Sequence, residues 1–483
     1  MRTGRRGACV ALGVAAALLA ASCGSSDDSD EAAPTTEKGA ATTAAAGGTT
    51  ANSFGPDPKN PKVILGPEGY KIDTAKCAAG WKDNEGTTDT EIRIAQSWVF
   101  TGNVASAGPQ SLAMKALMEH VNATEGGVAG KKIVFTSKDD GYEAARTKAN
   151  VDELLETVKP LAFAAIDATP GNLAVYDKLN ESCVPHLLAA TGHPAMSDPV
   201  NHPWTTGSFL AYEIEGSILA EYAATQLGKG GTVAGMFINN DAGIAYRKGF
   251  EKKAKEAGLN LVKAETFEAA AATVTNEVTT LASTNADAFF IATIGATCTQ
   301  GIKSLSETSW KPKLKLIASV CVANTLSVAG PAAADFVEAG YRKTTETAEA
   351  MRTDPDAIKM KEILEKGGVD ASDPNSHSGF IYGYPLVQIL KNAAKLPGGL
   401  TRTNVMLAAQ SLDFDHPSYL SINGKKIKFQ LNGLKDVAYT EGAAMQRWVI
   451  DPATGAGVWK PFGEIIEQNG QSVACAWDGK ACK

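Results

Sequence analysis

The chain has 483 residues, 44% of them hydrophobic, which is enough for globular domains of ordinary size with buried cores. Acidic residues outnumber basic ones by 53 to 46, the net charge is −7, and no basic helix is flanked by aromatic residues. This balance argues against a nucleic-acid partner.

Residues 1–22 have the pattern of a signal peptide. An apolar run at 8–21 follows three arginines and is too short to cross a bilayer. The small residues before Cys23 resemble a bacterial lipobox, in which the cysteine is acylated and becomes the new N-terminus. Lipoboxes usually have leucine where this chain has Ala20, so a plain signal peptide with an incidental cysteine is the alternative. No later apolar run is long enough to span a membrane.

Residues 23–88 are expected to form a lipidated flexible tether followed by an N-terminal extension. Residues 24–53 contain no Val, Ile, Leu, Met, Phe, Trp or Tyr, so they cannot bury enough apolar surface to offset the entropy lost on ordering. A lipid anchor at Cys23 followed by such a tether would hold a folded domain at the extracytoplasmic face of the membrane, in the periplasm or at the cell surface.

Six further cysteines predict disulfides, because an even number of cysteines in an exported chain is typical of a disulfide framework. Cys475 and Cys482 are the favoured pair, since the short loop between them contains a turn-forming Asp-Gly. The sequence leaves the pairing of the other four open, with free buried thiols as the alternative: Cys77, Cys183, Cys298 and Cys321. No Cys or His spacing suggests a metal site.

From residue 91 onward, nearly all-apolar strands alternate with amphipathic helices. The first series has strands at 91–99, 131–137, 160–167 and 185–190 and helices at 111–123, 142–158 and 172–182. The second has helices at 213–227, 244–257, 273–283 and 299–307 and strands at 231–239, 259–267, 287–294 and 313–320. Such strands are typical of parallel sheets covered on both faces, so each series predicts one doubly wound α/β lobe.

The C-terminal part is less regular, with a predicted helix at 378–396 and strands at 426–431 and 443–450. We assign 89–207 with part of 340–410 to lobe 1, 208–338 with part of 411–465 to lobe 2, and 466–483 to a tail. Ligands of open parallel sheets bind beyond the carboxyl ends of the strands. The sequence therefore predicts a ligand cleft between two lobes.

Enzyme motifs are absent from the sequence. There is no H-E-x-x-H, no G-x-S-x-G and no EF-hand loop, and no acid–base pair stands at an interpretable spacing. We therefore favour a binding protein that has no catalytic activity, cofactor or metal. An enzyme such as an amidase, with a site assembled only in space, is the alternative.

Several short motifs carry a resemblance to a known family. They are Thr101-Gly102, Gly126-Gly127-Val128, Asp139-Asp140-Gly141 and Val184-Pro185, continued by VAGMFINNDAGIAYRKGFEKKAKEAG and ADAFFIATIGATCTQGIKSL. In this order and spacing, residues 91–450 resemble type I periplasmic binding proteins of the leucine/isoleucine/valine-binding branch. The resemblance implies two parallel-sheet lobes joined by a multi-strand hinge.

The resemblance also implies how a ligand is held. In the family, one lobe binds the ligand first, through backbone N–H groups and a hydroxyl at helix N-termini, where an anion is stabilised. Thr169 supplies the matching hydroxyl, with a helix cap as the alternative role. Trp98 would stack on the ligand or belong to the core. The candidate ligand-binding residues are Trp98, Gly102, Asn103, Asp167, Ala168, Thr169, Ala190, Thr191, Gly192, Ala242, Gly243, Gly295 and Thr297.

The chain departs from the amino-acid binders at three positions. Ala107 and Ala242 replace aromatic residues, and Thr297 replaces the acid that would hold the ligand's ammonium group. An ammonium group needs a counter-charge in a closed, dry cleft. We therefore expect a small carboxylate, amide or aromatic compound rather than a branched-chain amino acid.

The resemblance implies a monomeric solute-binding lipoprotein of an ABC importer, which closes over its ligand and delivers it to a membrane permease. A ligand-sensing receptor module of the same fold is the alternative.

Overall fold

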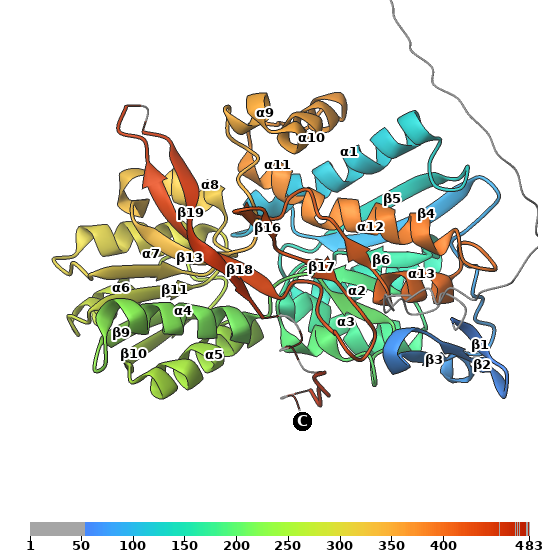
Figure 1. Ribbon diagram of the computed structural model, residues 1–483, viewed down its shortest axis with the longest axis horizontal. Coiled ribbons are helices and arrows are strands. Elements are labelled where there is room, and N and C mark those ends of the chain that lie inside the picture. Colours follow the sequence, from blue (N-terminus) through green and yellow to red (C-terminus); the bar gives the residue numbers. More distant parts are fainter. Residues whose placement is uncertain are drawn as a thin grey trace, which may run out of the picture. The chain divides into compact units, whose positions relative to one another are not determined.

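The computed structural model describes residues 54–483 except positions 454, 469, 471, 473, 480, 481 and 483. The signal peptide, Cys23 and the segment 24–53 lie outside the described residues. The described part contains two large sheets, each covered by helices, together with three small sheets (Figure 1). None of the described helices combines the length and the apolar character that crossing a membrane requires.

Lobe 1 is built on a five-stranded parallel sheet in the order β5-β4-β6-β7-β8. Its elements are β4 (Glu91–Trp98), α1 (Gly108–Glu125), β5 (Lys132–Asp139), α2 (Ala144–Thr157), β6 (Ala162–Ala164), α3 (Thr169–Glu181), β7 (His186–Ala189) and β8 (Thr205–Gly207). The inner strands β6 and β7 are buried throughout, which explains their apolar sequences.

Lobe 2 is built on a seven-stranded sheet in the order β10-β9-β11-β12-β13-β18-β19. The first five strands run parallel, and β18 and β19 are added antiparallel. The elements are α4 (Tyr212–Leu227), β9 (Thr232–Ile238), α5 (Asp241–Ala257), β10 (Asn260–Phe267), α6 (Thr275–Ala282), β11 (Ala288–Ala292), α7 (Ala296–Glu307), β12 (Leu314–Ile317), α8 (Ala323–Ala329), β13 (Phe336–Gly340), β18 (Gly442–Ile450) and β19 (Gly457–Glu467). The two strand series therefore form separate sheets, as predicted.

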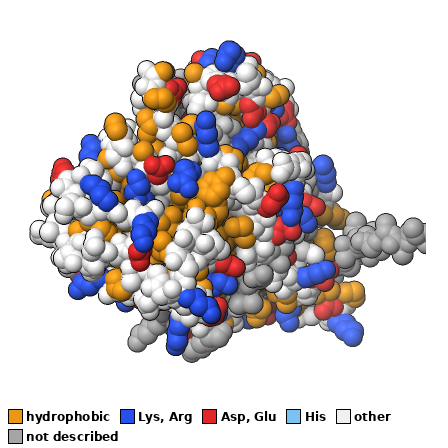
Figure 2. All heavy atoms as spheres, turned by 60° about the vertical axis from the view of Figure 1, so that its left-hand side comes forward, with side chains coloured by type: hydrophobic (Ala, Val, Ile, Leu, Met, Phe, Trp, Pro, Cys, Tyr) orange, Lys and Arg blue, Asp and Glu red, His pale blue; other side chains and the backbone are white. Residues whose placement is uncertain are grey.

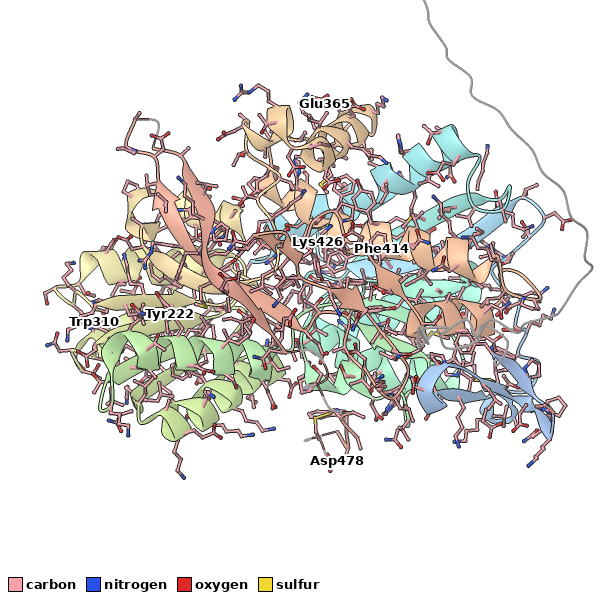
Figure 3. All side chains as sticks on the ribbon, viewed as in Figure 1. Tyr222, Trp310, Glu365, Phe414, Lys426 and Asp478 are labelled. Atoms are coloured by element: carbon pink, nitrogen blue, oxygen red, sulfur yellow. A yellow bond between two sulfur atoms is a disulfide. The ribbon has the colours of Figure 1, made fainter. Side chains whose placement is uncertain are left out.

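The C-terminal helices return to lobe 1. They are α9 (Ala350–Thr353), α10 (Pro355–Lys366), α11 (Pro374–Ser378), α12 (Phe380–Ala393) and α13 (Arg402–Gln410). Helices α10, α11 and α12 pack against α1 (Figure 1). The four strands that follow are short: β14 (Asp413–Phe414), β15 (Ser421–Ile422), β16 (Lys425–Lys426) and β17 (Phe429–Gln430). Figure 3 labels Phe414 and Lys426 in this segment. The predicted strand at 426–431 is therefore only partly correct.

The chain passes between the lobes at three places in the described residues. These are 208–211 between β8 and α4, 341–349 between β13 and α9, and 431–441 between β17 and β18. The linkage is thus the multi-segment hinge that the family resemblance implies. It also brings residues far apart in the sequence to the same border between the lobes.

An N-terminal extension packs on lobe 1. Its strands β1 (Gly55–Asp57), β2 (Asn60–Leu65) and β3 (Lys71–Asp73) form a small antiparallel sheet. The Trp81 indole donates a hydrogen bond to the Cys183 carbonyl at 2.8 Å, and Tyr70 donates one to the Pro203 carbonyl at 2.5 Å.

The described residues form three disulfides. Cys475 pairs with Cys482, which confirms the prediction. The two pairs that the sequence left open are Cys77–Cys183, between the extension and lobe 1, and Cys298–Cys321, within lobe 2. The alternative of free buried thiols is therefore wrong. The loop closed by Cys475 and Cys482 contains Asp478, which Figure 3 labels.

Candidate functional site

A cavity of about 650 Å³ lies between the two lobes, part of it open to solvent. Both lobes and two of the crossing segments contribute to its walls. The lining residues are Trp98, Ala107, Gln110, Tyr142, Asp167, Ala168, Thr169, Ala190, Phe209, Tyr212, Ile238, Ala242, Tyr246, Ala292, Thr293, Ile294, Val320, Val322, Arg342 and Tyr382. Several follow directly on parallel strands, where the sequence places the cleft.

The polar part of the lobe 1 wall is the turn between β6 and α3. The chain reverses sharply there, and Ala168 has the left-handed φ of 67°. Thr169, the first residue of α3, is thereby brought to the cavity. Its hydroxyl lies 2.6 Å from the hydroxyl of Thr191 on the next loop. This pair fixes the orientation of a hydroxyl at the N-terminus of α3, where it can donate a hydrogen bond to a polar ligand group or accept one from it.

Asp167 is the acidic group of the cavity. Its side chain is only 6% exposed, and its Oδ2 atom has no hydrogen-bond partner. Burial, reinforced by the nearby Asp140 carboxylate, raises the pKa of Asp167 to about 7. The Asp140 carboxylate differs in its surroundings, because Ser97 and Thr147 both donate hydrogen bonds to it. Asp167 is thus a buried acid that the described protein groups leave incompletely satisfied.

Aromatic rings line much of the cavity. The rings of Trp98 and Tyr382 meet edge to face at a centroid distance of 5.6 Å, and Phe209 lies 5.9 Å from Tyr382. Tyr212 and Tyr246 are stacked at 4.4 Å. The Trp98 indole donates a hydrogen bond to the Ala107 carbonyl at 2.9 Å. Trp98 is therefore both a core residue and part of the wall, so its two expected roles do not exclude each other.

The lobe 2 wall is mostly apolar and rests on a buried carboxylate. Glu215 on α4 accepts hydrogen bonds from the Ser319 N–H at 2.6 Å, from the Ser319 hydroxyl at 2.9 Å and from Tyr246 at 2.9 Å. Burial raises the pKa of Glu215 to about 7 despite these donors. The network holds Tyr246 against Tyr212 and so stabilises one side of the cavity.

Arg342 brings a cation to the cavity from the crossing segment after β13. It donates a hydrogen bond to the Ser319 carbonyl, and within the described chain it takes part in no ion pair at 4 Å or less. Arg342 and Val322 also line a second, more polar cavity of about 500 Å³. The guanidinium thus lies at the border between the two cavities.

The lobes touch beside the cavity. The Asn103 side chain donates a hydrogen bond to the Ala269 carbonyl at 3.2 Å, and the Ala296 N–H donates one to the Asn103 carbonyl at 3.1 Å. Gly295 permits this approach, since a Cβ there would lie 2.7 Å from the Asn103 oxygen. The structure is therefore one in which the first loop of lobe 1 is closed onto lobe 2.

The structure brings six of the thirteen candidate residues to the cavity surface: Trp98, Asp167, Ala168, Thr169, Ala190 and Ala242. Direct ligand contact by these residues stays a prediction. The other seven lie outside the lining: Gly102, Asn103, Thr191, Gly192, Gly243, Gly295 and Thr297.

The seven residues outside the lining are held by other contacts. Gly192 packs under Tyr212, because a Cβ there would lie 2.5 Å from the tyrosine ring. The Thr297 hydroxyl lies 2.7 Å from that of Thr293 and donates to the Ile294 carbonyl. Of the three positions that differ from the amino-acid binders, Ala107 and Ala242 therefore line the cavity. Thr297 does not line it and contacts the lining residue Thr293.

Sequence reasoning did not select four of the residues that shape the cavity most: Phe209, Tyr212, Arg342 and Tyr382. Phe209 and Arg342 lie within crossing segments, Tyr212 follows one directly, and Tyr382 lies on α12, a helix that could have returned to either lobe. A short crossing segment has no periodic pattern, so nothing in the local sequence marks these side chains as facing the cleft.

The described residues contain no group of three or more His, Cys, Asp or Glu side chains placed to hold a metal ion. The groups available at the cavity are hydroxyls, one amide, one carboxyl, one guanidinium and aromatic rings. This set can bind and orient a small organic molecule.

A family model described as "Periplasmic binding protein" matches residues 91–433, more than half of the chain. The chain belongs to this family. Its two parallel-sheet lobes are those of the type I periplasmic binding proteins, as the resemblance implies. Membership of a family of solute-binding proteins implies an extracytoplasmic location. No curated protein matches the chain.

Solved structures share the fold of this periplasmic binding protein at low sequence identity. A branched-chain amino acid ABC transporter protein from Thermus thermophilus, with bound valine, is 20% identical and has a TM-score of 0.69, over 79% of this chain and 97% of that one. A fatty acid ABC transporter substrate-binding protein from Thermomonospora curvata is 20% identical, with a TM-score of 0.64, over 81% and 95%. A solute-binding protein from Rhodopseudomonas palustris BisB5, in complex with 3,4-dihydroxy benzoic acid, is 17% identical, with a TM-score of 0.62, over 78% and 98%.

Proposed function

We propose that the protein captures a small organic solute between its lobes and delivers it to the permease of an ABC importer. The observation that carries the proposal is the cavity between the lobes, to which both contribute side chains. A ligand in such a cavity binds the closed form with contacts that the open form lacks, so it shifts the population toward closure. A permease that recognises the closed form would then receive only loaded protein.

The ligand we propose is a small carboxylate, amide or aromatic compound rather than a branched-chain amino acid. The aromatic walls, the small side chains of Ala107 and Ala242 and the hydroxyl of Thr169 support this ligand class. The ligands named for the structurally similar proteins include an amino acid, a fatty acid and an aromatic acid, so the fold itself accommodates ligands of these kinds.

Lipid attachment at Cys23 would keep the binding protein near its permease and raise its effective concentration there. The surface fits a solute binder better than a nucleic-acid binder, because acidic and basic side chains are interspersed on the face shown in Figure 2. Replacement of Cys23 by Ser in the producing cell should move the protein from the membrane fraction to the soluble fraction. Retention of the Cys23→Ser variant on the membrane would contradict the anchor.

The proposal is tested by a thermal-shift screen of the purified protein against amino acids, short-chain carboxylates, amides and aromatic acids, followed by calorimetry on each hit. We expect a shift with at least one carboxylate, amide or aromatic compound and none with leucine or valine. A large shift with leucine or valine alone would overturn the ligand class, and no shift with any solute would overturn solute binding.

A ligand-sensing receptor module is the second candidate, because the same closure could be read by a signalling partner. The two are separated by uptake of the identified ligand in cells that lack the gene. Loss of uptake supports delivery to a permease. Normal uptake with a lost transcriptional or behavioural response supports sensing.

A further inference from the structure

The cavity contains an acidic and a basic side chain, neither of which has an ion-pair partner in the described residues. Asp167 belongs to lobe 1, is 6% exposed and has an unpartnered Oδ2 atom. Arg342 belongs to the second crossing segment and donates one hydrogen bond, to a carbonyl oxygen. A buried charge without a counter-charge is costly, so a ligand that supplies one is bound more favourably.

The two charges do not neutralise each other. Asp167 and Arg342 form no ion pair, and they enter the cavity from different elements, Asp167 after β6 and Arg342 after β13. Two carboxylates, Glu338 and Glu215, act electrostatically on Arg342, but neither approaches it within ion-pair distance. The acid Asp140 raises the pKa of Asp167, and no cation acts on that carboxyl. Each charge is therefore available to a different part of one ligand.

Aromatic rings connect the surroundings of the two charges. Tyr382 interacts electrostatically with both Asp167 and Arg342, and its ring contacts those of Trp98 and Phe209. A flat ring bound against this wall would gain the favourable geometry of aromatic pairs in addition to burial. Ala107 and Ala242 leave space for such a ring where amino-acid binders carry aromatic side chains.

Resting on the proposed function, we infer that the ligand is an aromatic carboxylate that carries an amine or hydroxyl substituent on its ring or on a short ring side chain. Its carboxylate binds Arg342, the amine or hydroxyl donates to Asp167, and the ring lies against Trp98 and Tyr382. An α-amino acid is disfavoured, because Thr297 takes the place of the acid that holds its ammonium group and does not line the cavity.

The experiment compares matched ligands by calorimetry on the purified full-length protein. The probes are benzoate, 4-hydroxybenzoate, 4-(aminomethyl)benzoate and benzylamine, which add or remove one of the two polar groups at a time. A hydrogen bond to a charged group changes affinity by about tenfold to a hundredfold. We expect the better of the two donor-bearing acids to bind at least about tenfold more tightly than benzoate, and benzylamine to bind more weakly than that acid by a similar factor.

Variants of Asp167 and Arg342 test which side chain binds which polar group of the ligand. In Asp167→Asn, the preference for the donor-bearing acid over benzoate should fall to within about twofold, while benzoate affinity stays near its original value. In Arg342→Gln, all carboxylates should weaken together by about tenfold or more, and Arg342→Lys should restore part of that loss. Glu277→Gln is the matched control, because Glu277 on α6 also has a buried, unpartnered carboxylate oxygen, lies outside the crossing segments and does not line the cavity. It should leave every affinity unchanged.

Two outcomes would overturn the inference. In one, the wild-type protein binds benzoate and its donor-bearing analogues equally; in the other, Asp167→Asn keeps the full preference. Binding of a solute from the broad screen without binding of any probe refutes this inference alone, and the proposed function stands. Absence of binding in both experiments refutes the proposed function as well.

Discussion

The two walls of the cavity differ in chemistry. Lobe 1 contributes Asp167, Thr169, Gln110 and Tyr142, all with polar groups, whereas most of the lobe 2 wall is apolar, as in Ile238, Ala242, Ala292, Ile294, Val320 and Val322. This difference indicates that the two lobes have different roles in ligand binding. Lobe 1 has the groups that orient a ligand, and lobe 2 has the surface that removes it from water. Such an arrangement fits binding to lobe 1 first and closure of lobe 2 second.

Removal of the disulfides in the two lobes should cause the largest change, a loss in the free energy of unfolding. Cys77–Cys183 closes a loop with a sequence separation of 106, and Cys298–Cys321 one of 23. Because a longer loop loses more entropy on closure, replacing the first pair with serines should cost about 5 kcal/mol of unfolding free energy and replacing the second about 3 kcal/mol. Chemical denaturation of both double variants measures the difference. Equal losses, or a larger loss from the lobe 2 pair, would contradict this ranking.

Replacing the buried carboxylates of Asp167 and Glu215 with amides should change folding stability in opposite directions. Burial raises the folded-state pKa of Asp167 to about 7, so folding stability falls as the pH rises from the ordinary aspartate range through about 7. Asp167→Asn removes this penalty and should stabilise the unliganded protein at pH 8, by on the order of 3 kcal/mol, but not at pH 4.

Glu215 is the comparison for Asp167, because its pKa is also raised to about 7 by burial but its oxygens accept three hydrogen bonds. In Glu215→Gln one acceptor oxygen becomes a donor, so we expect a loss of about 1–3 kcal/mol at pH 8. Denaturation of both variants at pH 4 and pH 8 provides the measurement. Destabilisation by Asp167→Asn at pH 8 would show that its carboxylate has a partner in solution.

Closure of lobe 2 onto lobe 1 is tested at two glycines with nearly the same backbone conformation. Gly295 has φ 64° and would place a Cβ 2.7 Å from the Asn103 oxygen of lobe 1, while Gly330 has φ 62° and open space around it. Both alanine variants carry the same backbone strain. Only Gly295→Ala obstructs closure, so its ligand affinity should fall by about tenfold or more, while Gly330→Ala binds normally. Equal affinities in calorimetry would mean that the lobes close in another way.

Substitutions in two threonine pairs should cause the smallest change in ligand affinity. One pair lies in each lobe, so the two walls can be compared directly. Thr169 and Thr191 are paired at 2.6 Å in lobe 1, and Thr293 and Thr297 at 2.7 Å in lobe 2. Thr169→Val should weaken ligand binding by about fivefold to tenfold, because the hydroxyl at the N-terminus of α3 is lost. Thr293→Val should change affinity by less than about twofold. If Thr293→Val lost more ligand affinity than Thr169→Val, lobe 2 rather than lobe 1 would contain the groups that orient the ligand.

The fold class, the two strand series, the cleft at the strand ends and the Cys475–Cys482 pair could all be predicted from the sequence. These follow from local information: the apolar runs of buried strands, the periodicity of helices and a short loop with a turn. The missed elements include β8, β13, α8 and β1–β3, which are short or partly exposed and carry too few periods to be recognised. The longer α10, α13 and β19 were also missed, in the C-terminal part where turn-rich stretches interrupt the pattern.

The side chains that meet at the cavity could not be predicted from the sequence and are known only from the folded chain. Phe209, Arg342 and Tyr382 come from three distant parts of the chain, and their orientation depends on how the crossing segments and α12 pack. The partners of Cys77 and Cys298 depended on the same packing. The physical reason is that burial and periodicity are properties of neighbouring residues, whereas the convergence of side chains follows from the placement of whole lobes.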